Sequence, residues 1–177
     1  PADGMVWTRD DPVRIAGTAV DRDEFIADIA INGSPVFMEA SGPEVRFSED
    51  LVLADGRHEI DVQARNMMGG VVWQRMMLRV DRSGPLIAVD RFVPGKTVSG
   101  NLLDPAGISE FRINGQKVWL SGDGPIPFKG MLRSRTIELT AVDRLGNETR
   151  IQLDDGEDSL VSSRGWLAMG AGDETVD

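Results

Sequence analysis

The sequence predicts an all-β chain: two tandem β-sandwich domains of about seven short strands each, followed by a C-terminal tail. Short segments alternate apolar and polar residues, turn residues separate them, and no long stretch has helical spacing. The same order of strands and turns also occurs twice. We therefore place the first domain at residues 1–84, the second at 85–156 and the tail at 157–177.

One hairpin defines each domain. In the second domain, Ile137, Leu139 and Ala141 alternate with polar residues, residues 143–147 supply a turn, and alternation resumes to Leu153. In the first domain, residues 58–64 alternate, residues 65–70 turn, and residues 72–80 return. A hairpin that appears twice at the end of a domain indicates a duplication.

Glycines and aromatic residues keep the two halves in register. Matched pairs lie 83, 82 and 77 residues apart, which is the drift that small loop insertions and deletions produce. These pairs are Gly17 and Gly100, Gly33 and Gly115, and Gly69 and Gly146. Phe47 likewise matches Phe128.

Alternation also predicts the cores, which must rest on apolar packing because the chain has no Cys and no Tyr. A disulfide and a tyrosine corner are both excluded. The expected core residues are Ile60, Val62, Ala64, Val72 and Leu78 in the first domain, and Ile137, Leu139, Ala141, Ile151 and Leu153 in the second.

The second domain contains three motifs: Val98-Ser99-Gly100 with Asp104, Ile113-Asn114-Gly115 with Val118, and Ile137 with the run 141–147. These motifs resemble the immunoglobulin-like repeats of bacterial exported and surface proteins, including those related to the second domain of glucodextranase. The first domain repeats them but has Asn66 for the Asp and Gly70 for the final Asn. The resemblance implies immunoglobulin-like sandwiches that act as spacers, assembly surfaces or accessory carbohydrate-binding modules.

Charge and composition exclude several classes of function. The net charge of −10 argues against nucleic acid as a partner, and no apolar run is long enough to insert in a membrane. Residues 1–85 have a net charge of −6, residues 86–153 of +2 and residues 154–177 of −6. This alternation is compatible with simple solubility or with electrostatic pairing between copies. The chain starts at Pro1 without a signal peptide, so we interpret it as a processed piece of an exported protein, with a cell-surface, periplasmic or extracellular location.

The candidate chemistry is sparse, and we expect no catalytic residue and no cofactor. His58 is the single histidine, and no serine nucleophile motif accompanies it, so we interpret it as a structural or edge histidine. The acidic clusters around Asp21 and Asp23 and around Asp154 and Asp155 are weak Ca²⁺ candidates, because their spacing matches no EF-hand loop. We interpret both clusters first as solvated loops and keep Ca²⁺ binding as the alternative.

Three tryptophans are the candidate binding residues. Trp73 alternates with the residues predicted for the core and should face outward, and Trp119 follows the second Asn-Gly turn. Exposed Trp stacks on sugars or anchors a protein interface, although packing at a sandwich rim would also account for it. Trp166 lies in the one short apolar run of the acidic, glycine-containing tail, which is either a linker or a segment that docks by adding a strand.

These observations predict a non-catalytic tandem module of a larger bacterial exported or cell-surface protein. It would serve as a spacer and as an assembly surface for other protein domains or for copies of itself. The alternative is a carbohydrate-binding accessory module that binds polysaccharide. An enzyme would need two converging carboxylates in a cleft, which a small sandwich without long loops rarely builds.

Overall fold

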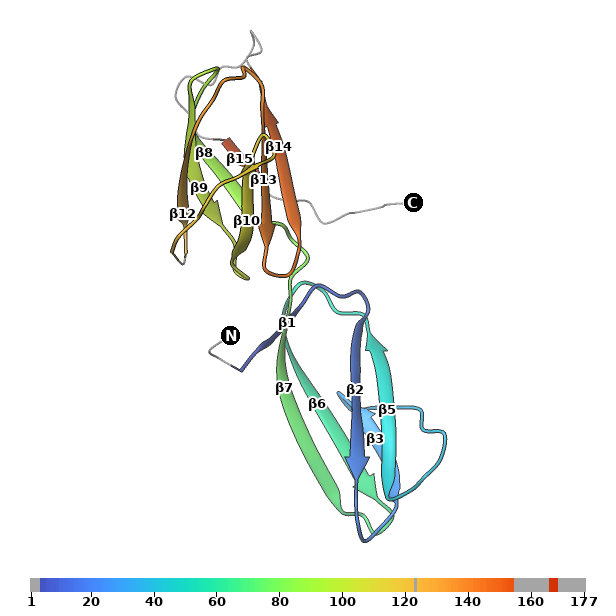
Figure 1. Ribbon diagram of the computed structural model, residues 1–177. Coiled ribbons are helices and arrows are strands. Elements are labelled where there is room, and N and C mark those ends of the chain that lie inside the picture. Colours follow the sequence, from blue (N-terminus) through green and yellow to red (C-terminus); the bar gives the residue numbers. More distant parts are fainter. Residues whose placement is uncertain (1–3, 123, 155–165, 169–177) are drawn as a thin grey trace. The chain divides into compact units, whose positions relative to one another are not determined.

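The computed structural model describes residues 4–122, 124–154 and 166–168, and all of its regular structure is β (Figure 1). The chain divides into two compact units, Pro1–Asp81 and Arg82–Asp177, each with its own hydrophobic core. The predicted fold of two tandem immunoglobulin-like sandwiches is confirmed. The division falls three residues before the expected boundary, because Gly84 packs against the backbone of Glu148 in the second unit.

Unit 1 contains a five-stranded sheet in the order β1-β7-β6-β3-β4 and a two-stranded sheet, β2-β5. All neighbours are antiparallel except β1, which pairs parallel with the end of β7. The strands are β1 (Val6–Thr8), β2 (Val13–Val20), β3 (Ile26–Ile31), β4 (Ser34–Pro35), β5 (Glu44–Leu51), β6 (Gly56–Asn66) and β7 (Val71–Val80).

Unit 2 contains two four-stranded sheets, β11-β10-β13-β14 and β12-β9-β8-β15. Its strands are β8 (Leu86–Val93), β9 (Thr97–Leu103), β10 (Ile108–Ile113), β11 (Gln116–Lys117), β12 (Ile126–Met131), β13 (Ile137–Asp143), β14 (Glu148–Leu153) and β15 (Trp166–Ala168). The strand β9 of unit 2 is equivalent to β2 of unit 1. In unit 2, β8 pairs with β9 on the side opposite β12, whereas in the described part of unit 1 no strand pairs with β2 on the side opposite β5.

Both Asn-Gly pairs form the predicted two-residue hairpin turns. Asn32 and Gly33 have φ values of 50° and 78°, and Asn114 and Gly115 have 50° and 74°. Positive φ at both central positions is what a type I′ turn requires, and Asn and Gly are the residues that adopt it most readily. The strands that follow these turns, β4 and β11, are only two residues long.

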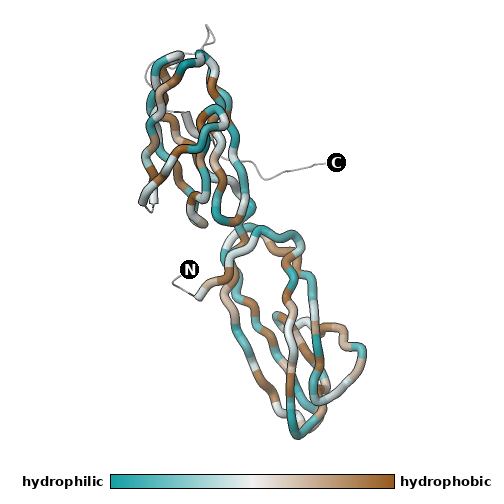
Figure 2. The backbone as a smooth tube through the Cα atoms, viewed as in Figure 1, coloured by the Kyte–Doolittle hydropathy of each residue, from teal (hydrophilic) through white to brown (hydrophobic). Residues whose placement is uncertain are grey.

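Hydrophobic and hydrophilic residues alternate along the paired strands (Figure 2), and the predicted cores are largely confirmed. Ile60 and Leu78 are buried in unit 1, and Ile137, Leu139 and Ala141 are at most 1% exposed in unit 2. The prediction for Val72 was wrong, because its side chain is 72% exposed. Val72 lies on the inner face of β7, but the two-stranded sheet opposite does not cover this part of the strand.

Candidate functional site

The three predicted binding tryptophans lie in different surroundings. Trp73 is 62% exposed near the start of β7, and Trp119 is 89% exposed in unit 2, with the Lys117 ammonium 5.8 Å from its ring centroid. The backbone of Trp166 belongs to β15 and pairs with Val89 of β8, so the tail adds a strand to a sheet of its own unit. The side chain of Trp166 lies outside the described part of the chain.

A ladder of polar side chains surrounds Trp73 on the outer face of the five-stranded sheet. Gln63 stands opposite Trp73 in the register of β6 and β7, and Arg75 follows two residues along. The Arg75 guanidinium donates hydrogen bonds of 2.8 and 3.3 Å to the two carboxylate oxygens of Asp61, and these bonds raise its pKa above the ordinary arginine value. Trp73 is thus a flat apolar platform beside fixed charges and an amide.

Asp21 holds a loop together. Its carboxylate accepts hydrogen bonds from the Asn66 side-chain amide at 2.9 Å and from the backbone N–H groups of Asp23 and Glu24 at 3.0 and 3.1 Å. These bonds, that from Asn66 first, hold its pKa below the ordinary aspartate value.

The structure brings no metal-binding cluster together among the residues it describes: no group of three His, Cys, Asp or Glu side chains converges there. Asp155, Glu157 and Asp158 of the second acidic cluster fall outside that part of the chain. A Ca²⁺ site at Asp21, Asp23, Asp154 or Asp155 therefore stays an untested prediction.

His58 is half-buried near the start of β6, and its Nε2 donates a hydrogen bond of 2.7 Å to the carbonyl oxygen of Ala54. This bond closes the turn that leads into the strand and gives the histidine a structural role. In the described part of the chain, no helix is long and apolar enough to cross a membrane.

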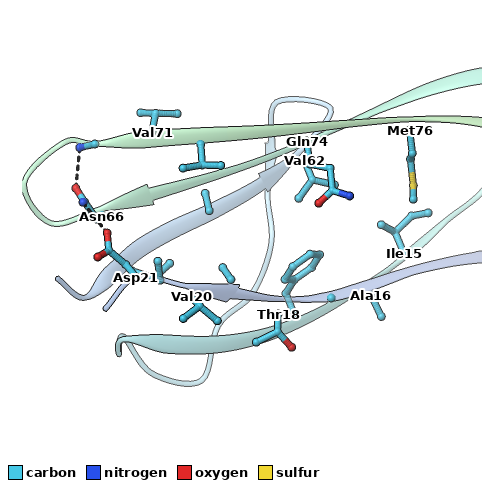
Figure 3. A pocket seen from close by; sticks show the side chains of 17 residues that line it. Ile15, Ala16, Thr18, Val20, Asp21, Val62, Asn66, Val71, Gln74 and Met76 are labelled. Atoms are coloured by element: carbon cyan, nitrogen blue, oxygen red, sulfur yellow. Dashed lines mark hydrogen bonds between the residues drawn. The ribbon is translucent and has the colours of Figure 1, made fainter. Parts of the chain in front are cut away.

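An apolar groove of about 450 Å³ lies in unit 1, between β2 and the inner face of β7 (Figure 3). We call it the β2–β7 groove. Phe47 is one of its lining residues, and Asn66 and Asp21 are joined by a hydrogen bond at one end. Its main lining residues are Ile15 to Asp21 of β2 and the loop after it, Val62 and Ala64 of β6, and Val71, Val72, Gln74 and Met76 of β7.

Exposed apolar side chains gather at the same end of unit 1, in a surface that we call the apolar tip. The backbone N–H of Met67 donates to the carbonyl of Phe25 at 2.9 Å, which holds the β6–β7 turn beside the start of β3. The members of the apolar tip, with their exposed fractions, are Val20 (61%), Phe25 (50%), Met67 (59%), Met68 (77%) and Val71 (42%).

The sequence patterns predicted neither the groove nor the tip. Met67 and Met68 occupy an exposed turn. A signal was present, because the equivalent turn of the second repeat has Arg144 and Leu145 at those two positions. Two consecutive methionines in a turn are unusual enough to mark a surface.

The fold defines an immunoglobulin-like or fibronectin type III-like class of β-sandwich. No known family model matches the chain, and no curated protein matches it. The similar solved structures include the fibronectin(III)-like modules of Clostridium thermocellum CbhA, with 11% identity, a TM-score of 0.38, and coverage of 84% of this chain and 85% of that one.

Two further solved structures are also similar to this chain. One is the surface glycan-binding protein SGBP-B of the mixed-linkage glucan utilization locus of Bacteroides ovatus, in complex with a heptasaccharide (15% identity, TM-score 0.29, 86% of this chain). This chain spans 43% of that protein. The other is titin Z1Z2 in complex with telethonin (13% identity, TM-score 0.31, 86% of this chain and 92% of that chain).

Proposed function

We propose that this chain is a non-catalytic tandem immunoglobulin-like module of a larger bacterial exported or cell-surface protein, in which it acts as a spacer and a protein-assembly surface. The observation that supports the assembly role is the apolar tip of unit 1. Monomeric soluble proteins rarely leave contiguous large apolar side chains in water, and such patches mark interaction sites. The resemblance of the hairpin motifs to repeats of bacterial exported proteins supports the location.

The chemistry of the tip favours a protein partner. Met67 and Met68 have flexible, polarizable side chains that adapt to the shape of a partner, and Phe25 adds a rigid ring. A partner that covers the tip removes these groups from water, and the burial of apolar area drives the association.

The spacer role follows from the way the chain divides. Each unit has its own core of buried residues, so neither needs the other for its packing. The connection between β7 and β8 is only residues 81–85, and Pro85 fixes one of its backbone angles. Two sandwiches with separate cores on a short connection are suited to a spacer role.

Capture from the cell envelope of the source bacterium tests the assembly role. The immobilised chain should retain a partner, or a second copy, that the double variant Met67→Ser/Met68→Ser retains at least about tenfold more weakly, since each buried methionine contributes about 1.5–3 kcal/mol. Met131→Ser is the matched control, because Met131 is 91% exposed in unit 2. A chain that stays monomeric and retains nothing would remove the assembly role.

Carbohydrate binding is the second candidate, and the Trp73 platform favours it. A flat exposed indole beside a guanidinium and an amide offers stacking and hydrogen bonding to a sugar ring. Trp119, with Lys117 close to its ring, offers the same chemistry in unit 2. Replacing Trp73 or Trp119 by Ala should abolish retention on a polysaccharide column, and unchanged retention would count against this function.

A further inference from the structure

The two halves of this duplicated chain differ at one position in the sheet. In unit 2, β9 has a neighbour on each side, β12 and β8. In unit 1, the equivalent strand β2 pairs along its whole length with β5 and with no other strand among residues 4–154. One edge of β2 therefore presents backbone N–H and C=O groups without a ladder partner, which is the template for an added strand.

The missing neighbour leaves an apolar surface uncovered. On β14, Thr149 is 3% exposed, and the chain that leads into β8 passes against it at Gly84. Val72 stands at the equivalent place on β7, three residues after the matched glycine, and is 72% exposed. Figure 3 shows this part of β7 facing β2 across the groove, with Val71 and Val20 near its end.

Exposure grows steadily along β7 towards this uncovered end. Val80 is 1% exposed and Leu78 is 3% exposed, Met76 is half-buried, and Gln74 and Val72 are exposed. These side chains are every second residue of β7 and therefore all point to the same face of the strand. A strand added beside β2 would cover the exposed part of this row, so that the whole row would be buried.

We propose that the β2–β7 groove is the docking site for a strand donated by a partner protein, which pairs antiparallel with β2 and buries alternate apolar side chains against Val72. The proposal deepens the assembly role and rests on it. The strand β8 shows what such a segment is like: it runs antiparallel to β9, and its Ile87 and Val89 are at most 2% exposed. Backbone pairing supplies affinity in this mode of recognition, and pockets for alternate side chains supply specificity.

Charge adds a requirement on the donated strand. Residues 1–85 have a net charge of −6, and Asp21 stands at the end of the groove that the first residues of an antiparallel strand would reach. A Lys or Arg before the apolar residues would therefore be favoured. The tail of a second copy fits poorly, because residues 154–177 also have a net charge of −6 and β15 is already paired with β8.

A synthetic peptide with two lysines followed by the sequence of β8 tests the site on the intact chain. We expect saturable binding by fluorescence anisotropy, together with slower hydrogen exchange of the β2 amides. The same peptide with the changes I87N and V89N should bind at least about tenfold more weakly, because two buried apolar side chains are lost.

Two lysine variants on opposite faces of β7 give the matched control. Val72→Lys places a charge in the groove and should weaken the peptide about tenfold, whereas Met77→Lys places the same charge on the outer face of β7 and should leave binding unchanged within about twofold. Both sites are exposed, so both variants should keep two thermal transitions.

Several results would overturn the proposal. They are the absence of saturable binding, equal binding of the two peptides, or protection at β8 instead of β2. If hydrogen exchange of the β2 amides slows as the protein concentration is raised without peptide, the groove belongs to a second copy.

If envelope capture through Met67 and Met68 persists while the peptide fails to bind, only this inference falls. If the peptide binds while capture fails, the assembly role falls.

Discussion

Val72 and Thr149 occupy equivalent positions in the last strands of two copies of one fold, and one side chain is 72% exposed while the other is 3% exposed. Each residue follows its matched turn glycine, Gly69 or Gly146, by three positions. The strand that carries it lies opposite the β2 sheet in unit 1 and opposite the β9 sheet in unit 2. The number of strands in that second sheet, two against four, decides whether the position belongs to a core.

This contrast predicts opposite responses to the same charge. Val72→Lys should change the free energy of unfolding of unit 1 by less than about 0.5 kcal/mol, because the ammonium stays in water. Thr149→Lys should destabilise unit 2 by about 3 kcal/mol or more, because it forces a charge into a buried site. Calorimetry with two resolved transitions measures both, and an equal loss in the two units would contradict the assignment.

The matched glycines of β2 and β9 predict a second contrast. A Cβ at Gly100 would stand 2.1 Å from the carbonyl oxygen of Ala88 in β8 and 2.8 Å from the Phe128 ring. At Gly17 it would meet only the Phe47 ring, also at 2.8 Å, and that ring is half-buried beside the groove. A clash with backbone requires two strands to separate, whereas a side chain can turn aside.

Gly100→Ala should therefore destabilise unit 2 by about 3 kcal/mol, and Gly17→Ala should cost unit 1 about 1 kcal/mol. Urea unfolding of the two single variants measures the difference. Ala88→Gly is a useful control, since it leaves the clashing carbonyl in place and should not rescue Gly100→Ala.

Much of this fold could be predicted from the sequence because turns and alternation are local. Asn32-Gly33 and Asn114-Gly115 specify their own backbone angles, and the pattern around Ile60 and Ile137 specifies which face of each strand is buried. The matched glycines indicated that the domain occurs twice in the chain. None of these features depends on how the two sheets of a sandwich cover each other.

The groove could not be predicted in this way, because alternation states which face of a strand is apolar and not whether another sheet covers it. Val72 has the same pattern as Leu78, yet only Leu78 lies under the opposite sheet. The exposed fractions of Met67 and Met68 likewise depend on whether another part of the fold covers the β6–β7 turn, and alternation does not specify this. The outward side chains of Trp73 and Trp119 were anticipated, since local alternation and turn position suffice for them, and their role in binding stays a prediction.

Asp21 predicts how unit 1 responds to acid. Hydrogen bonds from Asn66 first, and then from the backbone of Asp23 and Glu24, lower its pKa in the folded chain below the ordinary value of 3.8. The unfolded chain then binds the proton more readily, so the stabilisation is fully present above pH 3.8 and is lost as pH falls from there through the folded pKa.

Carboxyl resonances in a pH titration give this pKa directly. Asn66→Ala removes the largest cause, so the Asp21 pKa should rise towards 3.8. An unchanged Asp21 pKa in the Asn66→Ala variant would show that the two loop amides alone account for the shift.

Asp143 predicts the cost of opening the hairpin turn of unit 2. The carboxylate is 1% exposed and accepts three hydrogen bonds of 2.8 Å, from the backbone N–H groups of Leu145 and Asn147 and from the Asn147 side chain. Asp143→Ala leaves these donors without their acceptor and should destabilise unit 2 by about 2–4 kcal/mol.

Asp143→Asn should cost only about 1 kcal/mol, because one amide oxygen can still accept both backbone bonds. In unit 1 the matched residue is Asn66, whose side-chain oxygen accepts one of these backbone bonds, from the Gly70 N–H at 2.7 Å. Equal losses in the two variants, measured by urea unfolding, would show that the charge of Asp143 is required and that the hydrogen-bonded turn geometry alone is insufficient.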